Sequence, residues 1–481
     1  FGWCKEPDMN SKKILCVLSV VATSLLSACA NFGQQVPLDN PTAYSLPDGK
    51  TADVRSAWWR QLKDPKLNRY IEQALEKAPA LQAARSRMEQ AQAQIGLVGA
   101  ANKTQVSLNA TGFGMLSSSK PDMPYSPEAQ PNHVLTLANT SLQVGWSFDF
   151  WGKNRAQIAS VIGQQNAIRY EAEQTRLMLA HAVAAQYFAW QGLKAQQDIL
   201  KQRIDNASAH EKLLQQRVKA QLLAPSAVYS AQQARQQLEG QILALEREAA
   251  RARHALAVLT GQPANALDKD SPSSMAGVPV VRSGTLRADL LARRPDIAAQ
   301  RELLNSKTKA IQSTRAEFYP NIELKLLAGL SRIDAFNLIN NQSGMLGVLP
   351  AVHLPIFTSG ALQSKLAGRH AEYNQQVAQY NQTVLDAMRT AADAVSDYQI
   401  SRQQLTQQQA VLATARKSVA AIQRRVGAGL ENKTAYLQKN DELLQQQAAL
   451  SIQQSTALLA WSHLQAQLGG GFLADEGEKI E

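Results

Sequence analysis

The sequence predicts an α+β membrane protein: a trimeric 12-stranded transmembrane β-barrel, with four strands from each chain, continued by a long α-helical barrel. Three observations predict this class. Large apolar residues alternate with small or polar ones from 142 to 150, which is the period of a strand with one apolar face. Residues 153–219 contain no proline and are rich in good helix formers, so they favour one helix on the order of 100 Å long. Both patterns recur in the second half of the chain as an internal tandem duplication.

Composition narrows the class further. Of the 481 residues 45% are hydrophobic but only 6% are aromatic, which favours repeated helices over several packed globular cores. We interpret the formal charge of +11 as the solvated surface of Arg- and Lys-rich helices, and we expect no nucleic-acid partner. The seven histidines show no metal-ligand spacing, and no phosphate-binding glycine loop occurs. We therefore expect no enzyme activity, no metal site and no cofactor.

The first 28 residues are expected to be a signal peptide with a short stretch in front of it. Met9 is interpreted as the start, with residues 1–8 upstream of it. Lysines then precede an apolar run over 14–26, which is too short to cross a bilayer as a helix and ends in small residues. This combination is typical of a secretory signal.

Cys29 is the predicted lipidation site. The sequence Leu26-Ser27-Ala28-Cys29 resembles the bacterial lipobox, in which the cysteine is acylated and becomes the first residue of the mature protein. Ala30 follows the cysteine, and by the sorting rule this implies the outer membrane. An ordinary signal peptide with an unmodified cysteine is the alternative. Residues 30–481 contain no cysteine, so neither a disulfide framework nor a Cys metal site is expected.

The segment from the lipid site to the first helix is predicted to be an extended tether. Residues 29–55 contain three prolines and few large apolar residues. Trp58-Trp59 follows, and we favour packing over a ligand site for this pair. Asp64-Pro65 then predicts the start of a helix over about 65–102.

The repeat divides the mature chain into two halves. At a constant offset of 216 residues, Pro79 matches Pro295 and Arg85 matches Arg301. The predicted boundaries are 56–282 for the first repeat and 283–472 for the second, with a tail at 473–481. Each half reads helix, strand, loop, strand, long helix, returning helix.

The four predicted strands lie at about 104–113, 140–150, 321–329 and 345–357. Four strands cannot close a barrel, and an open sheet edge is not tolerated in lipid. Two copies would give eight strands and a barrel filled by its own side chains, so a conduit requires three copies. A half-buried sheet of a soluble protein is the alternative that the strands alone leave open. The aromatic residues expected at the membrane interface are Trp146, Phe148, Phe150, Trp151 and Phe357.

The predicted helices supply a second argument for a tube. The outgoing helices, about 153–221 and 361–427, are nearly twice as long as the returning ones, about 227–260 and 435–468. The helices before the strands, about 65–102 and 286–319, can stack end to end with the returning helices and restore the missing length. Each chain would then supply two long helices and two stacked helices of the same length, so three copies would form a tube of twelve such helices. A coiled-coil rod is the alternative, but the intervening strands argue against it.

With these features the chain resembles the outer-membrane factor family, the TolC and NodT type of efflux channel lipoprotein. The resemblance covers about residues 55–472. The segments that carry it are Trp58-Trp59 with Asp64-Pro65-Lys66-Leu67, Phe148-Asp149-Phe150-Trp151-Gly152, Arg294-Pro295-Asp296-Ile297, Phe318-Tyr319-Pro320, Leu354-Pro355-Ile356-Phe357 and Leu468-Gly469-Gly470-Gly471-Phe472.

The resemblance implies a homotrimer in the bacterial outer membrane that continues as a tunnel through the periplasm. It also implies two partners, a periplasmic adaptor protein and an inner-membrane pump, usually proton-driven. The tunnel passes drugs or other small toxic molecules, does no chemistry, and opens at its periplasmic tip. The segments that match the family's adaptor-contact motif supply the following residues: Arg217, Val218 and Leu222 in the first half, and Arg425, Val426, Gly427, Gly429 and Leu430 in the second. The first segment departs from the motif at Lys219 and Gln221. The alternative is that both segments are only turns that end a helix.

The predicted gate departs from the family. Relatives often carry two aspartates one turn apart after the second tip, and the corresponding residues here are Ala435 and Gln438. Asp441 lies a further turn along. Our hypothesis is that Asp441 takes part of the role of the acidic ring, with Gln438 as a neutral constriction. A solvated surface carboxylate is the alternative.

Two other functions use parts of the same pattern. A type I protein-secretion conduit would have the same fold, although the lipobox and Trp58-Trp59 favour drug efflux. A lipid-anchored periplasmic coiled-coil scaffold would have no pore, and the alternating strands argue against it.

Overall fold

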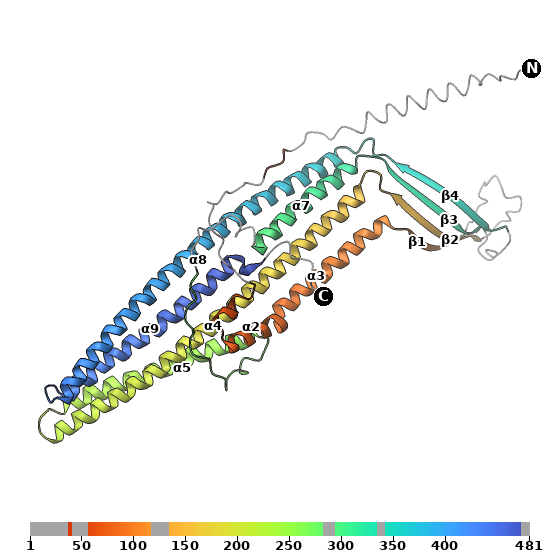
Figure 1. The fold of residues 1–481 in the computed structure, drawn as a ribbon. Coiled ribbons are helices and arrows are strands. Elements are labelled where there is room, and N and C mark those ends of the chain that lie inside the picture. Colours follow the sequence, from red (N-terminus) through yellow and green to blue (C-terminus); the bar gives the residue numbers. More distant parts are fainter. Residues whose placement is uncertain (1–36, 41–55, 117–133, 282–293, 334–341, 473–481) are drawn as a thin grey trace, which may run out of the picture. The chain divides into compact units, whose positions relative to one another are not determined.

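The computed structural model describes residues 37–40, 56–116, 134–281, 294–333 and 342–472 of the 481-residue chain (Figure 1). The chain folds as two compact units, and each unit takes segments from both sequence repeats. Unit 1 includes described residues from 37–40, 89–166 and 302–378, and unit 2 those from 56–88, 167–301 and 379–472. The two repeats follow one another along the chain, but each compact unit is built from parts of both.

The same order of elements occurs twice. The first half contains η1 (Trp58–Leu62), α2 (Pro65–Lys77), α3 (Pro79–Gly99), η2 (Ala100–Asn102), β1 (Gln105–Leu116), β2 (Val134–Phe148), α4 (Lys153–Lys219) and α5 (Ser226–Leu259). The second contains α7 (Pro295–Ala316), β3 (Asn321–Ile333), β4 (Gly344–His353), α8 (Ala361–Gly427), α9 (Lys433–Gln467) and η4 (Gly469–Gly471). Helices α4 and α8 are each 67 residues long, on the order of 100 Å.

Two predicted elements differ from the structure. The single helix predicted over 65–102 is broken at Ala78, which has an extended backbone (φ −62°, ψ 130°) because Pro79 follows it. The strand predicted over 345–357 ends at His353, before Pro355, whose nitrogen cannot donate a hydrogen bond to a ladder. Phe357 therefore lies outside the sheet, and so do Phe150 and Trp151, since β2 ends at Phe148. Part of the helix predicted over 286–319 lies outside the described residues.

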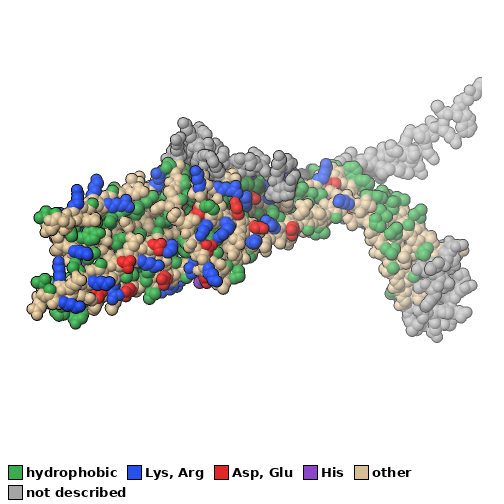
Figure 2. Space-filling view, turned by 60° about the horizontal axis from the view of Figure 1, so that its bottom comes forward, with side chains coloured by type: hydrophobic (Ala, Val, Ile, Leu, Met, Phe, Trp, Pro, Cys, Tyr) green, Lys and Arg blue, Asp and Glu red, His purple; other side chains and the backbone are tan. Residues whose placement is uncertain are grey.

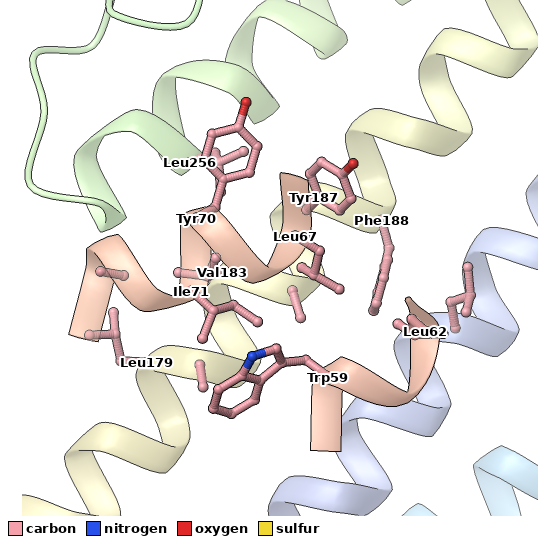
Figure 3. Close-up of a cluster of buried hydrophobic side chains, with 14 of the residues drawn as sticks. Trp59, Leu62, Leu67, Tyr70, Ile71, Leu179, Val183, Tyr187, Phe188 and Leu256 are labelled. Carbon is pink, nitrogen blue, oxygen red and sulfur yellow. The ribbon is translucent and has the colours of Figure 1, made fainter. Parts of the chain in front are cut away.

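The core of unit 2 confirms the packing interpretation of Trp58-Trp59. Trp58 is fully buried and Trp59 is 5% exposed. The Trp58 ring meets the rings of Trp59 and Trp461 edge-on, with centroids 5.6 Å and 5.3 Å apart. Leu67, Ile71 and other apolar side chains of α2 pack into the same cluster with side chains of α4 and α5 (Figure 3).

Asp64 begins α2 and joins it to this core. Its carboxylate accepts hydrogen bonds from the backbone N–H groups of Lys66 and Leu67, 2.9 and 3.3 Å away, which caps the helix. The same carboxylate accepts from Tyr187 Oη at 2.9 Å and Gln191 Nε2 at 3.1 Å, both on α4. Burial raises the pKa of the Tyr187 hydroxyl, which therefore stays protonated as a donor.

Residues 260–281, which follow α5, contain no helix or strand and lie in unit 2. Gln191 of α4 donates to the carbonyl of Ser273, 3.0 Å away, and Gln454 of α9 donates to that of Ala276 at the same distance. Tyr398 of α8 donates to the carbonyl of Pro279, 2.7 Å away. This segment ties three helices together through side-chain amides and a hydroxyl.

Unit 1 contains the four-stranded antiparallel sheet, in the order β1-β2-β3-β4. Asp149 follows β2 and caps α4, since its carboxylate accepts from the backbone N–H groups of Asn154 and Arg155. Strand and long helix are thus joined by a single short turn. No helix in the described residues is long and apolar enough to cross a membrane.

Candidate functional site: a two-faced sheet and paired helical tips

One face of the sheet is apolar on all four strands. Because side chains alternate along a strand, the register fixes which residues share a face. This face carries Val106 and Leu108 of β1, Leu142, Val144, Trp146 and Phe148 of β2, Ile322, Leu324 and Leu326 of β3, and Leu346, Val348, Pro350 and Val352 of β4.

The apolar face is exposed within the single chain. Leu108 is 69% exposed, Val352 68% and Leu346 87%, and hydrophobic side chains lie over the strands in Figure 2. A protein surrounded by water rarely leaves so continuous an apolar surface uncovered. The face therefore requires an apolar environment such as lipid.

The opposite face is mostly polar on β1, β2 and β3, whereas β4 places Met345, Gly347, Leu349 and Ala351 on it. Gln105, Ser107 and Asn109 of β1 lie on it beside Gln143 of β2. β3 adds Glu323 and Lys325, whose side chains form an ion pair with 3.3 Å between Nζ and the carboxylate. A sheet with one apolar and one polar face has the two surfaces of a membrane barrel wall.

Both outer strands of the sheet have an unpaired edge within the chain. β1 pairs with β2 and β4 with β3, and no further strand of the described residues joins either. Because neighbouring strands are antiparallel in the order β1-β2-β3-β4, β4 runs opposite to β1. β4 of one copy can therefore pair with β1 of the next in the same antiparallel sense.

The predicted interface aromatics lie at the end of the sheet next to the long helices. Trp146 and Phe148 are in β2, while Phe150 and Trp151 are in the turn that follows, and the rings of Phe148 and Phe150 are stacked 5.8 Å apart. Trp151 Nε1 donates to the carbonyl of Pro320, 2.9 Å away. Phe357 is 85% exposed.

The two predicted tip segments adopt the same turn. Leu222 N–H donates to the carbonyl of Arg217 and Leu430 N–H to that of Arg425, both at 2.9 Å, which is the 6→1 bond of a Schellman motif. The left-handed position is Gly429 in the second tip (φ +73°) and Gln221 in the first (φ +62°). The departure of the first segment from the motif thus leaves the turn unchanged, although glutamine is strained where glycine is not.

The side chains of the tips face solvent. Leu222 is 72% and Leu430 73% exposed, and Arg425, Gly427 and Gly429 are exposed as well. Val218, Arg217 and Val426 are half-buried. Both turns lie at the same end of unit 2 (Figure 1).

The residues predicted to form the gate lie on α9, and the structure adds a partner that sequence reasoning missed. Arg203 of α4 donates to both carboxylate oxygens of Asp441, from Nε at 2.8 Å and from Nη2 at 3.1 Å. Asn206 of α4 also donates to the carbonyl of Leu437, 2.8 Å away. Ala435 is half-buried and Gln438 is exposed. No sequence signal linked Arg203 with Asp441, which are 238 residues apart.

Two further expectations concern chemistry. The predicted lipidation site, Cys29, lies outside the described residues. Within the described residues, no group of three or more His, Cys, Asp or Glu side chains is placed to hold a metal ion.

A family model described as outer membrane efflux protein matches residues 70–262 and 286–470. The multidrug resistance outer membrane protein MdtP of Escherichia coli strain K12 is 29% identical over 487 aligned residues, which cover 96% of this chain and 97% of that protein. The crystal structure of the outer membrane protein VceC of Vibrio cholerae matches with a TM-score of 0.75 and 27% identity, over 87% of this chain and 100% of that one. The CmeC outer membrane channel of Campylobacter jejuni shares the fold, with a TM-score of 0.77 and 19% identity over 92% and 95% of the two chains.

Proposed function

The chain belongs to the outer membrane efflux protein family, and from this premise we propose that it is the outer-membrane channel subunit of a tripartite efflux system. In this proposal the channel passes drugs or other small toxic molecules from an inner-membrane pump and a periplasmic adaptor to the cell exterior. The names of the relatives, which describe multidrug resistance proteins, support this substrate class. Energy comes from the pump, which we expect to be proton-driven, and the channel itself does no chemistry.

The observation that carries the proposal is the sheet with one exposed apolar face and two open edges. Three copies, joined β4 to β1, give a closed barrel of twelve strands with the apolar face toward lipid and the polar face toward the lumen. Two copies would give about eight strands and an interior filled by side chains. A coiled-coil scaffold without a pore would not require a sheet with an exposed apolar face and two open edges.

Disulfide cross-linking tests the closed barrel. A Cys pair at Asn109 of β1 and Gly347 of β4, with neighbouring positions scanned for register, should link chains and give species of up to three subunits on a denaturing gel. The matched control pairs Asn109 with Ser141, which face each other across β1 and β2 of one chain and should leave the monomer band in place. If every β1–β4 pair gives only monomers, the shared barrel is wrong.

We place the adaptor contact at the two tips and the lipid anchor at Cys29. The exposed Leu222 and Leu430 support the first assignment, because an exposed leucine at a helix end is a ready anchor for a partner helix. Leu430→Glu should reduce co-purification of the adaptor, while the exposed Leu243→Glu on α5 serves as control. Cys29→Ala should abolish incorporation of labelled palmitate.

We propose that the Arg203–Asp441 pair is a latch that keeps the tip closed, beside the uncharged Ala435 and Gln438. The charge of Asp441 is balanced by Arg203, so the pair replaces the acidic ring that the sequence suggested. Arg203→Gln with Asp441→Asn should loosen α9 from α4 and let large antibiotics such as vancomycin enter cells. The control is Lys439→Gln with Glu442→Gln, an exposed pair on α9 alone. Equal vancomycin sensitivity in both variants would remove the latch from the proposal.

A further inference from the structure

We propose that the tip end of the helical hairpins is a basic collar, which makes the entrance of the conduit prefer anionic solutes. The collar comprises two 18-residue stretches, 212–229 around the first turn and 416–433 around the second. The inference rests on the conduit proposed above. It adds the chemical class that the entrance favours, namely solutes carrying a carboxylate, sulfonate or phosphate.

The charge of the chain is concentrated in these stretches. They contain eight Lys and Arg and one acidic residue, a net charge of +7 of the +11 carried by the whole chain. The cations are Lys212, Arg217 and Lys219 in the first stretch and Arg416, Lys417, Arg424, Arg425 and Lys433 in the second. Figure 2 shows Lys and Arg side chains at this end of unit 2.

Within the part of the chain that the structure describes, Arg425 is the collar cation with an ion-pair partner. A carboxylate oxygen of Glu431, the acidic residue, lies 3.7 Å from Nη2 of Arg425, and all of the cations except Arg217 are exposed. The carboxylates just outside the collar already have partners. Arg235 holds the pKa of Glu211 below its usual range, and Asp441 is paired with Arg203.

The helix pairs α4–α5 and α8–α9 hold the cations of the collar at the same end of unit 2. The bonds from Arg203 to Asp441 and from Asn206 to Leu437 keep α4 beside α9 close to the turns. On α9, the next positions toward the strands are Ala435 and Gln438, which carry no charge. An ion that passes the collar therefore meets no ring of unpaired carboxylates from this part of α9.

The field of such a collar acts over the width of a pore. The Debye length is about 8 Å at physiological ionic strength, and charges lining an opening with protein walls raise the local concentration of counter-ions about tenfold or more. Three copies multiply the charge of one. We expect chloride to permeate about three- to tenfold better than potassium, with the preference weakening as salt rises.

The test is the reversal potential of the purified full-length protein in a planar bilayer under a tenfold KCl gradient. The reversal potential of the wild-type protein should have the sign expected of a channel that is more permeable to chloride than to potassium. Lys219→Gln with Arg424→Gln should move the potential toward zero, and Lys219→Glu with Arg424→Glu should move it further toward potassium. The matched control, Arg85→Gln with Arg87→Gln, removes two exposed cations of α3 and should leave the potential unchanged.

The outcomes separate the collar from the conduit. A potassium preference, or a chloride preference unaffected by the tip variants, overturns the collar and leaves the conduit intact. If wild-type protein carries no current, the measurement is repeated with Arg203→Gln and Asp441→Asn, which remove one charge of each sign. No current from that folded and inserted variant overturns the conduit itself.

Discussion

Asp64 is the residue at which a single substitution should cost unit 2 the most stability through hydrogen bonds. It is 7% exposed and accepts from two backbone N–H groups at the start of α2 and from Tyr187 and Gln191 of α4. Asp64→Ala removes the helix cap, at about 1–2 kcal/mol. It also leaves the buried Tyr187 hydroxyl without its acceptor, at about 1–3 kcal/mol. Gln191 retains the carbonyl of Ser273, so the expected loss is the sum of these two contributions, about 2–5 kcal/mol.

The matched control is a second helix cap without a buried network. Asn432 caps α9 by accepting from the N–H of Ala435 at 2.9 Å, and it is exposed. Asn432→Ala should therefore cost about 1 kcal/mol. Asp64→Asn keeps one carbonyl oxygen in place and should fall between the two.

The assay is guanidinium unfolding in detergent at one protein concentration, followed by tryptophan fluorescence. Trp58, Trp59 and Trp461 are buried in the same cluster as α2, so they report on this core. If Asp64→Ala and Asn432→Ala lower the free energy of unfolding equally, the buried network contributes nothing and the reasoning is refuted.

Three other predictions follow from local geometry. Burial, with the neighbouring His463, lowers the pKa of His181 to about 4. Because the same side chain in the unfolded chain takes up its proton near pH 6.5, the free energy of unfolding should fall by up to about 3 kcal/mol as the pH drops from 6.5 toward 4. His181→Gln should flatten this pH dependence, as measured by thermal melting at a series of pH values. Gly329→Ala should disrupt the β2–β3 pair, since the added Cβ would lie 2.2 Å from the Thr140 carbonyl oxygen. Circular dichroism should show that the variant loses its heat-resistant β structure, and a thermal melt identical to that of the wild type would contradict the prediction. Gln221→Gly should stabilise the first tip by about 1 kcal/mol, because the left-handed backbone no longer strains a side chain; slower proteolysis at the turn is the readout, and unchanged cleavage argues against it.

Sequence patterns identified the long elements because each rests on a signal that repeats many times. The absence of proline over 153–219 predicted α4 to within its last turn, and the second outgoing helix matches α8 at both ends. Alternation located all four strands. The ends of elements depended on single residues, and the break at Ala78 was missed although Pro79 restricts the residue before it.

The site could be predicted only where its signal was local. The tip segments form one turn in both halves, as their repeated Arg-Val sequence suggested, because a Schellman turn depends on a few consecutive residues. The Arg203–Asp441 pair joins helices from different halves, and its register is set by the packing of α4 against α9. A carboxylate that looked available for a ring therefore proved to have a cation beside it.

The measurement that tests the central claim most directly is single-channel conductance of the detergent-purified protein in a planar lipid bilayer. We predict discrete, small and steady current steps, which become larger when Arg203→Gln and Asp441→Asn release the latch. The absence of current in both proteins, at every applied voltage and with insertion shown independently, would contradict the conduit.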